Sequence, residues 1–263
     1  MAHRLAQTRS RNASCRSSRC AQESWDFAVE KLTSQQWSPD QISAELEILK
    51  LPSMSHETIY LRIYADKNNG GEIHSHLRHK INSYRDRSLT QDNRGRIKGA
   101  TSIEKRPSVV DERSRIGDWE MDLVIGKVSG PALVTMVERK TRYTLIAKVP
   151  NKTSEAVALQ IMAKLLPHRS KLHTLTFDNG KEFAAHAMID EILGSTSYFA
   201  HPYSSWERGL NENTNGLIRQ YFPKGTDFEK VTDAQILEVE SKLNTRPRKC
   251  LDRRTPSAIF FNN

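Results

Sequence analysis

Cysteine is scarce in this chain of 263 residues, which contains only Cys15, Cys20 and Cys250. Three scattered cysteines are too few to build a disulfide framework. Cys15 and Cys20 lack a second pair of ligands at the spacing of a zinc site, so no zinc site is expected. This cysteine usage is typical of a reducing compartment, and we expect the chain in the cytoplasm.

Long apolar runs are missing as well. No stretch approaches the ~18 apolar residues that a membrane-spanning helix requires, and residues 133–137 are among the longest runs. No apolar segment of a secretory signal follows the N-terminus. Hydrophobic residues make up 37% of the chain, which is low for a compact domain but sufficient for a core. We therefore expect a folded core with polar, basic appendages and no membrane partner.

Positive charge is present in excess. Lys and Arg number 40 against 31 Asp and Glu, and the formal net charge is +9. Three stretches carry net charges of +5, +5 and +4, and the remainder of the chain is mildly acidic at −5. One charged run is usually a solvated surface, whereas three in one chain favour contact with a polyphosphate such as DNA. The three stretches are residues 1–20, 78–98 and 246–254.

Changes in composition and periodicity divide the chain into four expected segments. The first is an Arg/Ser-rich, disordered basic tail, whose composition is also similar to an organellar transit peptide. A helical segment and a basic linker follow, and the linker begins at an Asn-Asn-Gly-Gly breaker. The last segment has α/β periodicity. The expected boundaries are 1–22, 23–67, 68–108 and 109–263.

The helical segment predicts a helix-turn-helix. Ser38 and Gln41 have the spacing of a capping box, and Ser55 is placed to cap the next helix. Two short helices joined by a tight turn, after a leading helix, match this motif, although any small helical bundle would show the same periodicity. The basic surroundings favour DNA. The residues of the last helix expected to face inward are Ile59, Tyr60, Ile63 and Tyr64.

From residue 109 the pattern predicts a mixed sheet. Three consecutive strands with short connections are followed by alternating helices and strands, so helices are expected on both faces of the sheet. The expected strands are 118–125, 133–139, 143–149, 172–177 and 195–200. The expected helices are 153–166, 182–193, 204–221 and 233–243.

Three carboxylates stand out in this part. Asp178 closes an apolar strand before a glycine turn, where open α/β sheets place binding groups, although a turn or capping role would also fit. Asp122 shares one strand face with Asp118 and Glu120, and such acid clusters are more often exposed to solvent than catalytic. Three carboxylates from separate elements are what two divalent metal ions require.

Glu212 is expected on the polar side of its helix, away from a buried stripe that includes Leu210 and Leu217. Asn215 and Arg219 share its side, although an ordinary solvated face would fit the same spacing. At the start of this helix, Ser204 and Glu207 are spaced as a capping box.

The residues around these acids resemble those of a known family. Segments 117–123, 176–183 and 206–224 read GDWEMDL, TFDNGKEF and WERGLNENTNGLIRQYFPK. They resemble family thirty of the bacterial insertion-sequence transposases, and Asp122, Asp178 and Glu212 look like its DDE triad. This triad is shared with retroviral-type integrases. Segments 37–42, 55–60 and 244–256 add to the resemblance, which covers residues 35–263.

The resemblance implies an α/β, ribonuclease-H-like integrase catalytic core that follows a small all-α helix-turn-helix domain. It implies that Asp122, Asp178 and Glu212 bind two Mg²⁺ or Mn²⁺ ions. Water would release a 3′-hydroxyl at the end of a mobile element, and that hydroxyl would attack target DNA. A homodimer or larger assembly is implied, since two ends are joined, in a bacterial cytoplasm at the nucleoid.

Further residues are expected to meet DNA. Arg219 matches the basic residue that such enzymes place near DNA, seven positions after Glu212. The other residues expected to bind DNA are His56, Thr58, Arg62, Arg94, Arg96 and Lys224. The candidates for positioning the substrate are His201, Tyr203, Asn211 and Asn213.

One departure from the family leaves two alternatives open. Residues 1–22 do not match the additional N-terminal helix-turn-helix that members usually carry, so the chain is expected to be a truncated copy. Such a copy could bind DNA without activity and repress its parent element. A ribonuclease-H-like nuclease that cuts but does not join would use the same metal site.

Overall fold

A computed structural model describes residues 22–78, 97–127, 130–201, 204, 207 and 209–262. They form two compact units. The helical unit lies within residues 1–85 and 247–253, and the α/β unit lies within 86–246 and 254–263. No helix among the described residues is long and apolar enough to cross a membrane. Some predictions concern residues outside the described part of the chain, namely Cys15, Cys20, Arg94, Arg96, Tyr203, nearly all of the basic tail and most of the basic stretch 78–98.

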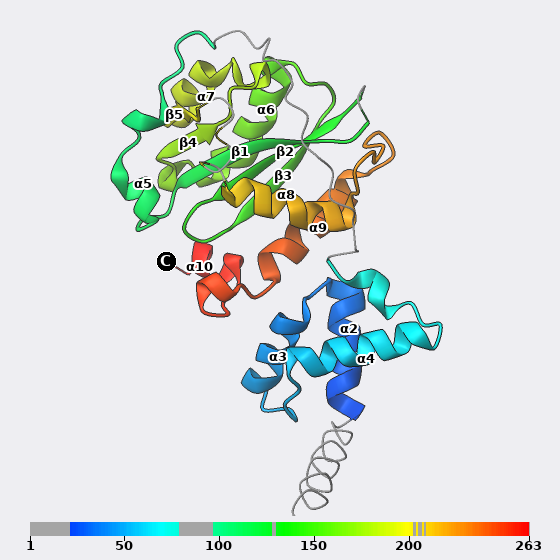
Figure 1. Cartoon of the computed structure of the whole chain (residues 1–263). Helices are drawn as coiled ribbons and strands as arrows, with labels where there is room; N and C mark the ends of the chain where they lie inside the picture. The colour runs from blue at the N-terminus through cyan, green and yellow to red at the C-terminus, as the bar shows by residue number, and fades with distance from the viewer. Residues whose placement is uncertain are drawn as a thin grey trace, which may run out of the picture. The chain divides into compact units, whose positions relative to one another are not determined.

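Three α-helices build the described part of the helical unit, as the periodicity predicts (Figure 1). They are α2 (Gln22–Gln35), α3 (Pro39–Ile48) and α4 (His56–Asn68). Ser38 and Gln41 make the reciprocal capping box at the start of α3, and the Ser55 hydroxyl accepts the N–H of Thr58 at 3.2 Å. Residues 247–253 join this unit, where Arg253 Nη1 pairs with Asp40 Oδ2 at 2.7 Å. The core comprises Ala28, Leu32, Trp37, Ile42, Leu46, Met54, Ile59 and Ile63.

The inward placement predicted for two tyrosines of α4 is wrong. Tyr60 is 36% exposed and Tyr64 is 50% exposed, and their rings stack with centroids 6.3 Å apart. Ile59 and Ile63 fill the buried stripe, and each tyrosine lies one residue, or about 100°, further around the helix. With Leu61, which is 71% exposed, the tyrosines form a second apolar stripe that faces solvent.

A five-stranded mixed sheet forms the centre of the α/β unit, in the order β3-β2-β1-β4-β5. β1 (Asp118–Ile125), β2 (Ala132–Glu138) and β3 (Thr144–Val149) are antiparallel neighbours. β4 (Thr174–Phe177) runs parallel to β1, and β5 (Thr196–Phe199) runs parallel to β4. The mixed sheet predicted from the sequence is therefore confirmed.

Helices cover both faces of the sheet (Figure 1). In chain order, these helices are α6 (Ser154–Leu165), η3 (Leu166–Lys171), α7 (His186–Leu193), α8 (Gly209–Tyr221), α9 (Asp233–Thr245) and α10 (Pro256–Phe261). Trp119 and Met121 of β1 pack with α6 and α7, whereas Val124 packs with α8 and α9. Because successive side chains of a strand point to opposite faces, the even-numbered residues of β1, Asp122 among them, face α8.

Two local expectations fail because tertiary partners intervene. α8 begins at Gly209 and not at residue 204, and Glu207 does not form a capping box with Ser204. The Glu207 carboxylate accepts the backbone N–H of His201 instead, at 2.8 Å. Part of the expected linker is also folded onto the edge of the sheet. Phe199 of β5 donates its N–H to the carbonyl of Thr101 at 2.8 Å, and η2 (Ile103–Lys105) and α5 (Ser108–Glu112) follow.

Side chains of α9 cover the outer edge of β3. The Asn244 side chain accepts the N–H of Thr144 at 2.8 Å and donates to its carbonyl at 2.7 Å. Glu240 Oε2 accepts the N–H of Ile146 at 2.6 Å. An edge strand otherwise presents unpaired backbone groups, so these bonds satisfy the edge and hold α9 in place.

We predict that Asn244→Ala destabilises the α/β unit by about 2–4 kcal/mol, because it leaves a buried N–H and a buried carbonyl unpaired. Hydrogen exchange of β1 and β2 amides, which open with the whole unit, measures this free energy of unfolding. Ser241→Ala, at an exposed position of the same helix, is the control and should change it little. Equal effects of the two substitutions would contradict the role of Asn244.

Candidate active site

Asp122 and Asp178 lie on neighbouring parallel strands. β1 and β4 pair in register as far as Glu120 and Thr176, so the same register two residues further brings Asp122 level with Asp178. Neighbouring strands are about 4.8 Å apart, and residues in parallel register point to one face. The half-buried Asp178 follows β4 directly and accepts the N–H of Gly180 at 2.9 Å. Both carboxylates therefore belong to the same end and the same face of the sheet.

Glu212 comes from α8, which lies across this face. Asn215 Nδ2 donates to Asp122 Oδ2 at 2.6 Å, and Arg219 Nη2 donates to the carbonyl of Ile125 at 2.6 Å. Residues three and seven positions after Glu212 share its side of the helix, so this side runs along β1. Glu212 itself is exposed in the first turn of α8. The helix thus presents its acid beside the strand that carries Asp122.

These carboxylates have the donor chemistry for a hard divalent cation, because all three offer oxygen atoms. In the part of the chain that the structure describes, no three His, Cys, Asp or Glu side chains are gathered closely enough to hold a metal ion. Asp122 is engaged by Asn215, and Asp178 is engaged by the turn that follows it. The fold therefore brings the elements of the triad together without forming a closed set of ligands.

Two acids before Asp122 on the same strand face are buried, against the expectation that such a cluster is exposed. Asp118 and Glu120 are each 1% exposed. Arg115 Nε and Nη2 each bind the Asp118 carboxylate at 2.9 Å, and Arg139 pairs with Glu120. Burial raises the pKa of Glu120, and the charge of Arg139 acts in the opposite direction. Each buried acid is thus neutralised by an arginine.

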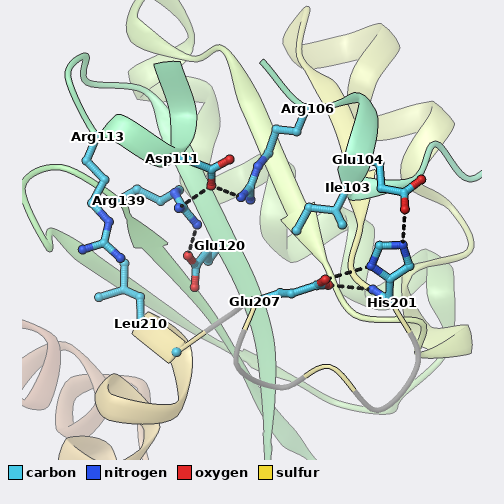
Figure 2. A pocket seen from close by; sticks show the side chains of 11 residues that line it. Ile103, Glu104, Arg106, Asp111, Arg113, Glu120, Arg139, His201, Glu207 and Leu210 are labelled. Atoms are coloured by element: carbon cyan, nitrogen blue, oxygen red, sulfur yellow. Dashed lines mark hydrogen bonds and ion pairs between the residues drawn. The ribbon is translucent and has the colours of Figure 1, made fainter. Parts of the chain in front are cut away.

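Glu120 belongs to a larger polar network that no local motif predicts (Figure 2). Arg139 Nη2 binds Asp111 Oδ1 at 3.2 Å, and Asp111 also pairs with Arg106. Arg106 Nη1 donates to the hydroxyl of Thr176 at 3.0 Å. Burial lowers the pKa of Arg139. The hydrogen-bonded partners of the network are 5 to 70 positions apart in the sequence, so no local pattern relates them. The buried arginines are the signal of this network, and their burial is seen only in the folded structure.

A cavity of about 490 Å³ opens beside this network (Figure 2). Gly209 and Leu210, at the start of α8, line it together with Glu120 and Arg139. Both acidic and basic side chains line it, so the cavity is polar without a strong charge of one sign. The remaining lining residues are Ile103, Glu104, Arg106, Asp111, Arg113, His201 and Glu207.

His201 joins three segments at the side of this cavity (Figure 2). Its Nδ1 lies 2.8 Å from Glu207 Oε1, and its Nε2 lies 3.3 Å from Glu104 Oε1. The hydrogen bond and the charge of Glu207 raise the pKa of His201 above its ordinary 6.5, and Glu104 adds to the effect. His201, two residues after β5, therefore contacts both η2 and the segment that leads to α8.

The other residues of the α/β unit that are expected to contact DNA or substrate differ in how far their side chains are exposed to solvent. Asn213 and Lys224 are exposed. Asn211 is 1% exposed, and its side-chain amide has no hydrogen-bond partner among the described residues. Arg219 is half-buried, and its guanidinium binds main-chain carbonyls, that of Ile125 included. Arg219 is thus partly engaged in holding α8 on β1.

In the helical unit, the expected DNA-contacting residues differ in the same way. His56 is exposed. Thr58 is half-buried, and its hydroxyl lies 3.0 Å from that of Ser55. The guanidinium of Arg62 lies over the Trp25 ring, 5.3 Å from its centroid. Thr58 and Arg62 therefore have structural partners, and sequence reasoning missed the exposed stripe beside them.

We predict that the His201 ring titrates with a midpoint above 6.5 and that Glu207→Gln lowers this midpoint more than Glu104→Gln does. Because the folded-state pKa is raised, the contact stabilises the fold below pH 6.5 and is lost as the pH rises through the folded-state value. Histidine NMR signals, assigned with His201→Gln, measure the midpoint. A midpoint that neither glutamate substitution moves would contradict the contact.

Comparison with known proteins gives the family. Residues 113–205 match the model of the integrase core domain. The transposase for insertion sequence element IS4351 of Bacteroides fragilis is 44% identical over 230 residues, which are 88% of this chain and 71% of that protein. The transposase InsI for IS30A of Escherichia coli (strain K12) is 38% identical over 248 residues, 89% of this chain and 63% of that protein. The catalytic core domain of BIV integrase has a TM-score of 0.43 and 23% identity, over 55% of this chain and 93% of that one. On the sequence matches, the chain belongs to the DDE transposases of bacterial insertion sequences.

Proposed function

We propose that this transposase binds the ends of its mobile element and that Asp122, Asp178 and Glu212 hold two Mg²⁺ or Mn²⁺ ions at the reacting phosphate. The parallel register of β1 and β4 is the observation that carries the proposal: it pairs Glu120 with Thr176, and continued by two residues it supports Asp122 and Asp178 as neighbours. The bond from Asn215 to Asp122 supports the placement of Glu212 beside them.

Two divalent ions in such a site would supply charge that activates the attacking oxygen and stabilises the leaving oxygen. In the first step, a water oxygen bonds to phosphorus at the element end, and the bond to the 3′ oxygen breaks and leaves a 3′-hydroxyl. In the second step, the oxygen of that hydroxyl bonds to a phosphorus of target DNA and loses its proton, and the bond from that phosphorus to the 3′ oxygen of the target strand breaks and leaves a 3′-hydroxyl there. Asn215 holds the Asp122 carboxylate, and the turn at Gly180 holds that of Asp178.

DNA is the proposed partner, held in part by the basic stretches. The proposed DNA contacts outside the helix-turn-helix are residues 78–98, Asn213 and Lys224. The proposed assembly is a homodimer or larger, and its proposed location is the bacterial cytoplasm. The stretch 246–254 contributes less than its charge suggests. Arg246 is 2% exposed and donates to the Tyr221 hydroxyl at 2.8 Å, and Arg253 is paired with Asp40.

The exposed side of α4 is the proposed DNA-reading surface of the helical unit. His56 supplies a polar group at its start, and the stacked Tyr60 and Tyr64 with Leu61 supply apolar and aromatic contacts. A helix in the major groove reads base edges with hydrogen bonds and reads thymine methyl groups with apolar side chains. An apolar stripe left in solvent is otherwise unfavourable, so DNA contact accounts for it.

We predict that Asp122→Asn, Asp178→Asn and Glu212→Gln each reduce nicking of element-end DNA in Mg²⁺ by about a hundredfold or more, with DNA binding retained. Loss of a metal ligand removes several kcal/mol of transition-state stabilisation. Glu238→Gln, an exposed glutamate on α9, is the control and should nick normally. Nicking that survives Asp178→Asn would refute the assignment. Nicked products without joined products would instead indicate a nuclease.

We also predict that Leu61→Ala and Tyr64→Ala each weaken binding to element-end DNA by about 1–3 kcal/mol more than they weaken binding to unrelated DNA, because they remove base contacts. Fluorescence anisotropy at one fixed salt concentration measures both affinities. Ile48→Ala removes another exposed apolar side chain, 58% exposed on α3, and is the matched control. Equal losses on both DNAs would exclude base reading by α4.

A further inference from the structure

The buried polar network reaches all three elements that carry the triad, one or two residues before each carboxylate. Its links are side chains of β1, β4 and α5, the arginines that directly follow η2 and β2, and a backbone N–H of α8. The places at which it touches the elements are Glu120 before Asp122, Thr176 before Asp178, and Asn211 before Glu212. A network placed in this way can hold the three elements at fixed distances from one another.

The contact with α8 is a helix cap, and the capping side chain, Glu120, belongs to strand β1. Glu120 Oε2 accepts the backbone N–H of Asn211 at 3.3 Å. α8 begins at Gly209, so this N–H is one of the first four, which have no partner within their own helix. A carboxylate at this end of a helix also interacts favourably with the helix dipole. Glu120 thus binds the turn of α8 that contains Glu212.

The Glu120 carboxylate is itself held from the other side. Its Oε1 pairs with Arg139, whose Nε donates to the carbonyl of Val110 at 3.0 Å and whose Nη2 binds Asp111 at 3.2 Å. The Arg139 side chain is only 5% exposed. Through Asp111 and Arg106 the same chain of contacts reaches Thr176 on β4. Glu120 therefore has little freedom to move.

We infer that Glu120 is a positioning residue that fixes the first turn of α8 on β1 and thereby sets the place of Glu212 relative to Asp122. This inference rests on the proposed metal-binding role of the triad. The other ties between α8 and β1, at Asn215 and Arg219, lie further along the helix. Without Glu120 the helix keeps those ties, and its first turn is free to move away from the strand.

Asp118 provides a matched control on the same strand. It is as buried as Glu120, faces the same side of the sheet and is also paired with an arginine. Its side-chain hydrogen bonds within the described residues go to Arg115 and Thr174, neither of which belongs to α8. Asp118→Asn therefore disturbs a buried ion pair of β1 without releasing the helix.

The experiment compares the full chain with Glu120→Gln, Asp118→Asn and the double variant Glu120→Met with Arg139→Met. The double variant removes the cap without leaving an unpaired buried charge, so it keeps the test possible if Glu120→Gln does not fold. Hydrogen exchange of residues 209–213 reports on the first turn of α8. Titration with Mn²⁺ in the absence of DNA, followed by electron paramagnetic resonance of the free ion, reports on the metal site without turnover.

The Glu120 variants should speed exchange at residues 209–213 and weaken Mn²⁺ binding by about tenfold to a hundredfold, the usual effect of losing a group that orients a ligand. Asp118→Asn should leave both readouts near those of the unmodified chain. Faster exchange with unchanged Mn²⁺ affinity, or an equal loss of affinity in Asp118→Asn, would overturn the inference and leave the proposed function standing. An unmodified chain that binds no Mn²⁺ would overturn the proposed function, and the inference with it.

Discussion

The parallel pairing of β1 with β4 is the constraint on which the site depends. β1 is the central strand, with β2 antiparallel on one side and β4 parallel on the other. Alternation along β1 sends Trp119 and Met121 into the core beneath α6 and α7. The same alternation sends its acids to the face covered by α8, and the register of β1 with β4, continued by two residues, points Asp178 to the same face. A shift of register by one residue would exchange these two faces.

A row of carboxylates on one strand face needs partners, because an unpaired buried charge is very unfavourable. Asp118 is paired with Arg115, and Glu120 is paired with Arg139. Asp122, which is half-buried, binds the neutral amide of Asn215. Along β1, Asp118 and Glu120 thus have arginine partners, and Asp122 has the amide of Asn215 among its partners. Of the three acids, Asp122 is the one proposed to hold a divalent cation, and it lies furthest along β1.

The helical unit and the α/β unit differ in how well local rules describe them. The capping box of Ser38 and Gln41 forms as its spacing predicts, because both partners lie in one turn of chain. The apparent capping box of Ser204 and Glu207 does not form, because His201 offers Glu207 two hydrogen bonds. Tyr60 and Tyr64 are exposed because the small core of this unit is filled by Ile59 and Ile63. Apolar character alone does not show which stripe of a helix is buried.

Sequence alone determined the order of the five strands and of the helices α6 to α9, the mixed sheet and the family, because periodicity and contiguous motifs depend on neighbouring residues. The short helices α5 and α10 were not predicted. It also placed Asp178 at the end of its strand and Glu212 on the polar side of its helix. Tertiary structure decided which side chains and backbone groups contact the residues around the proposed site. Glu120 and Asn211 are 91 positions apart, and Asp122 and Asn215 are 93 apart, so no local pattern relates them. Their pairing follows from strand register and helix packing, which depend on the burial of the whole core.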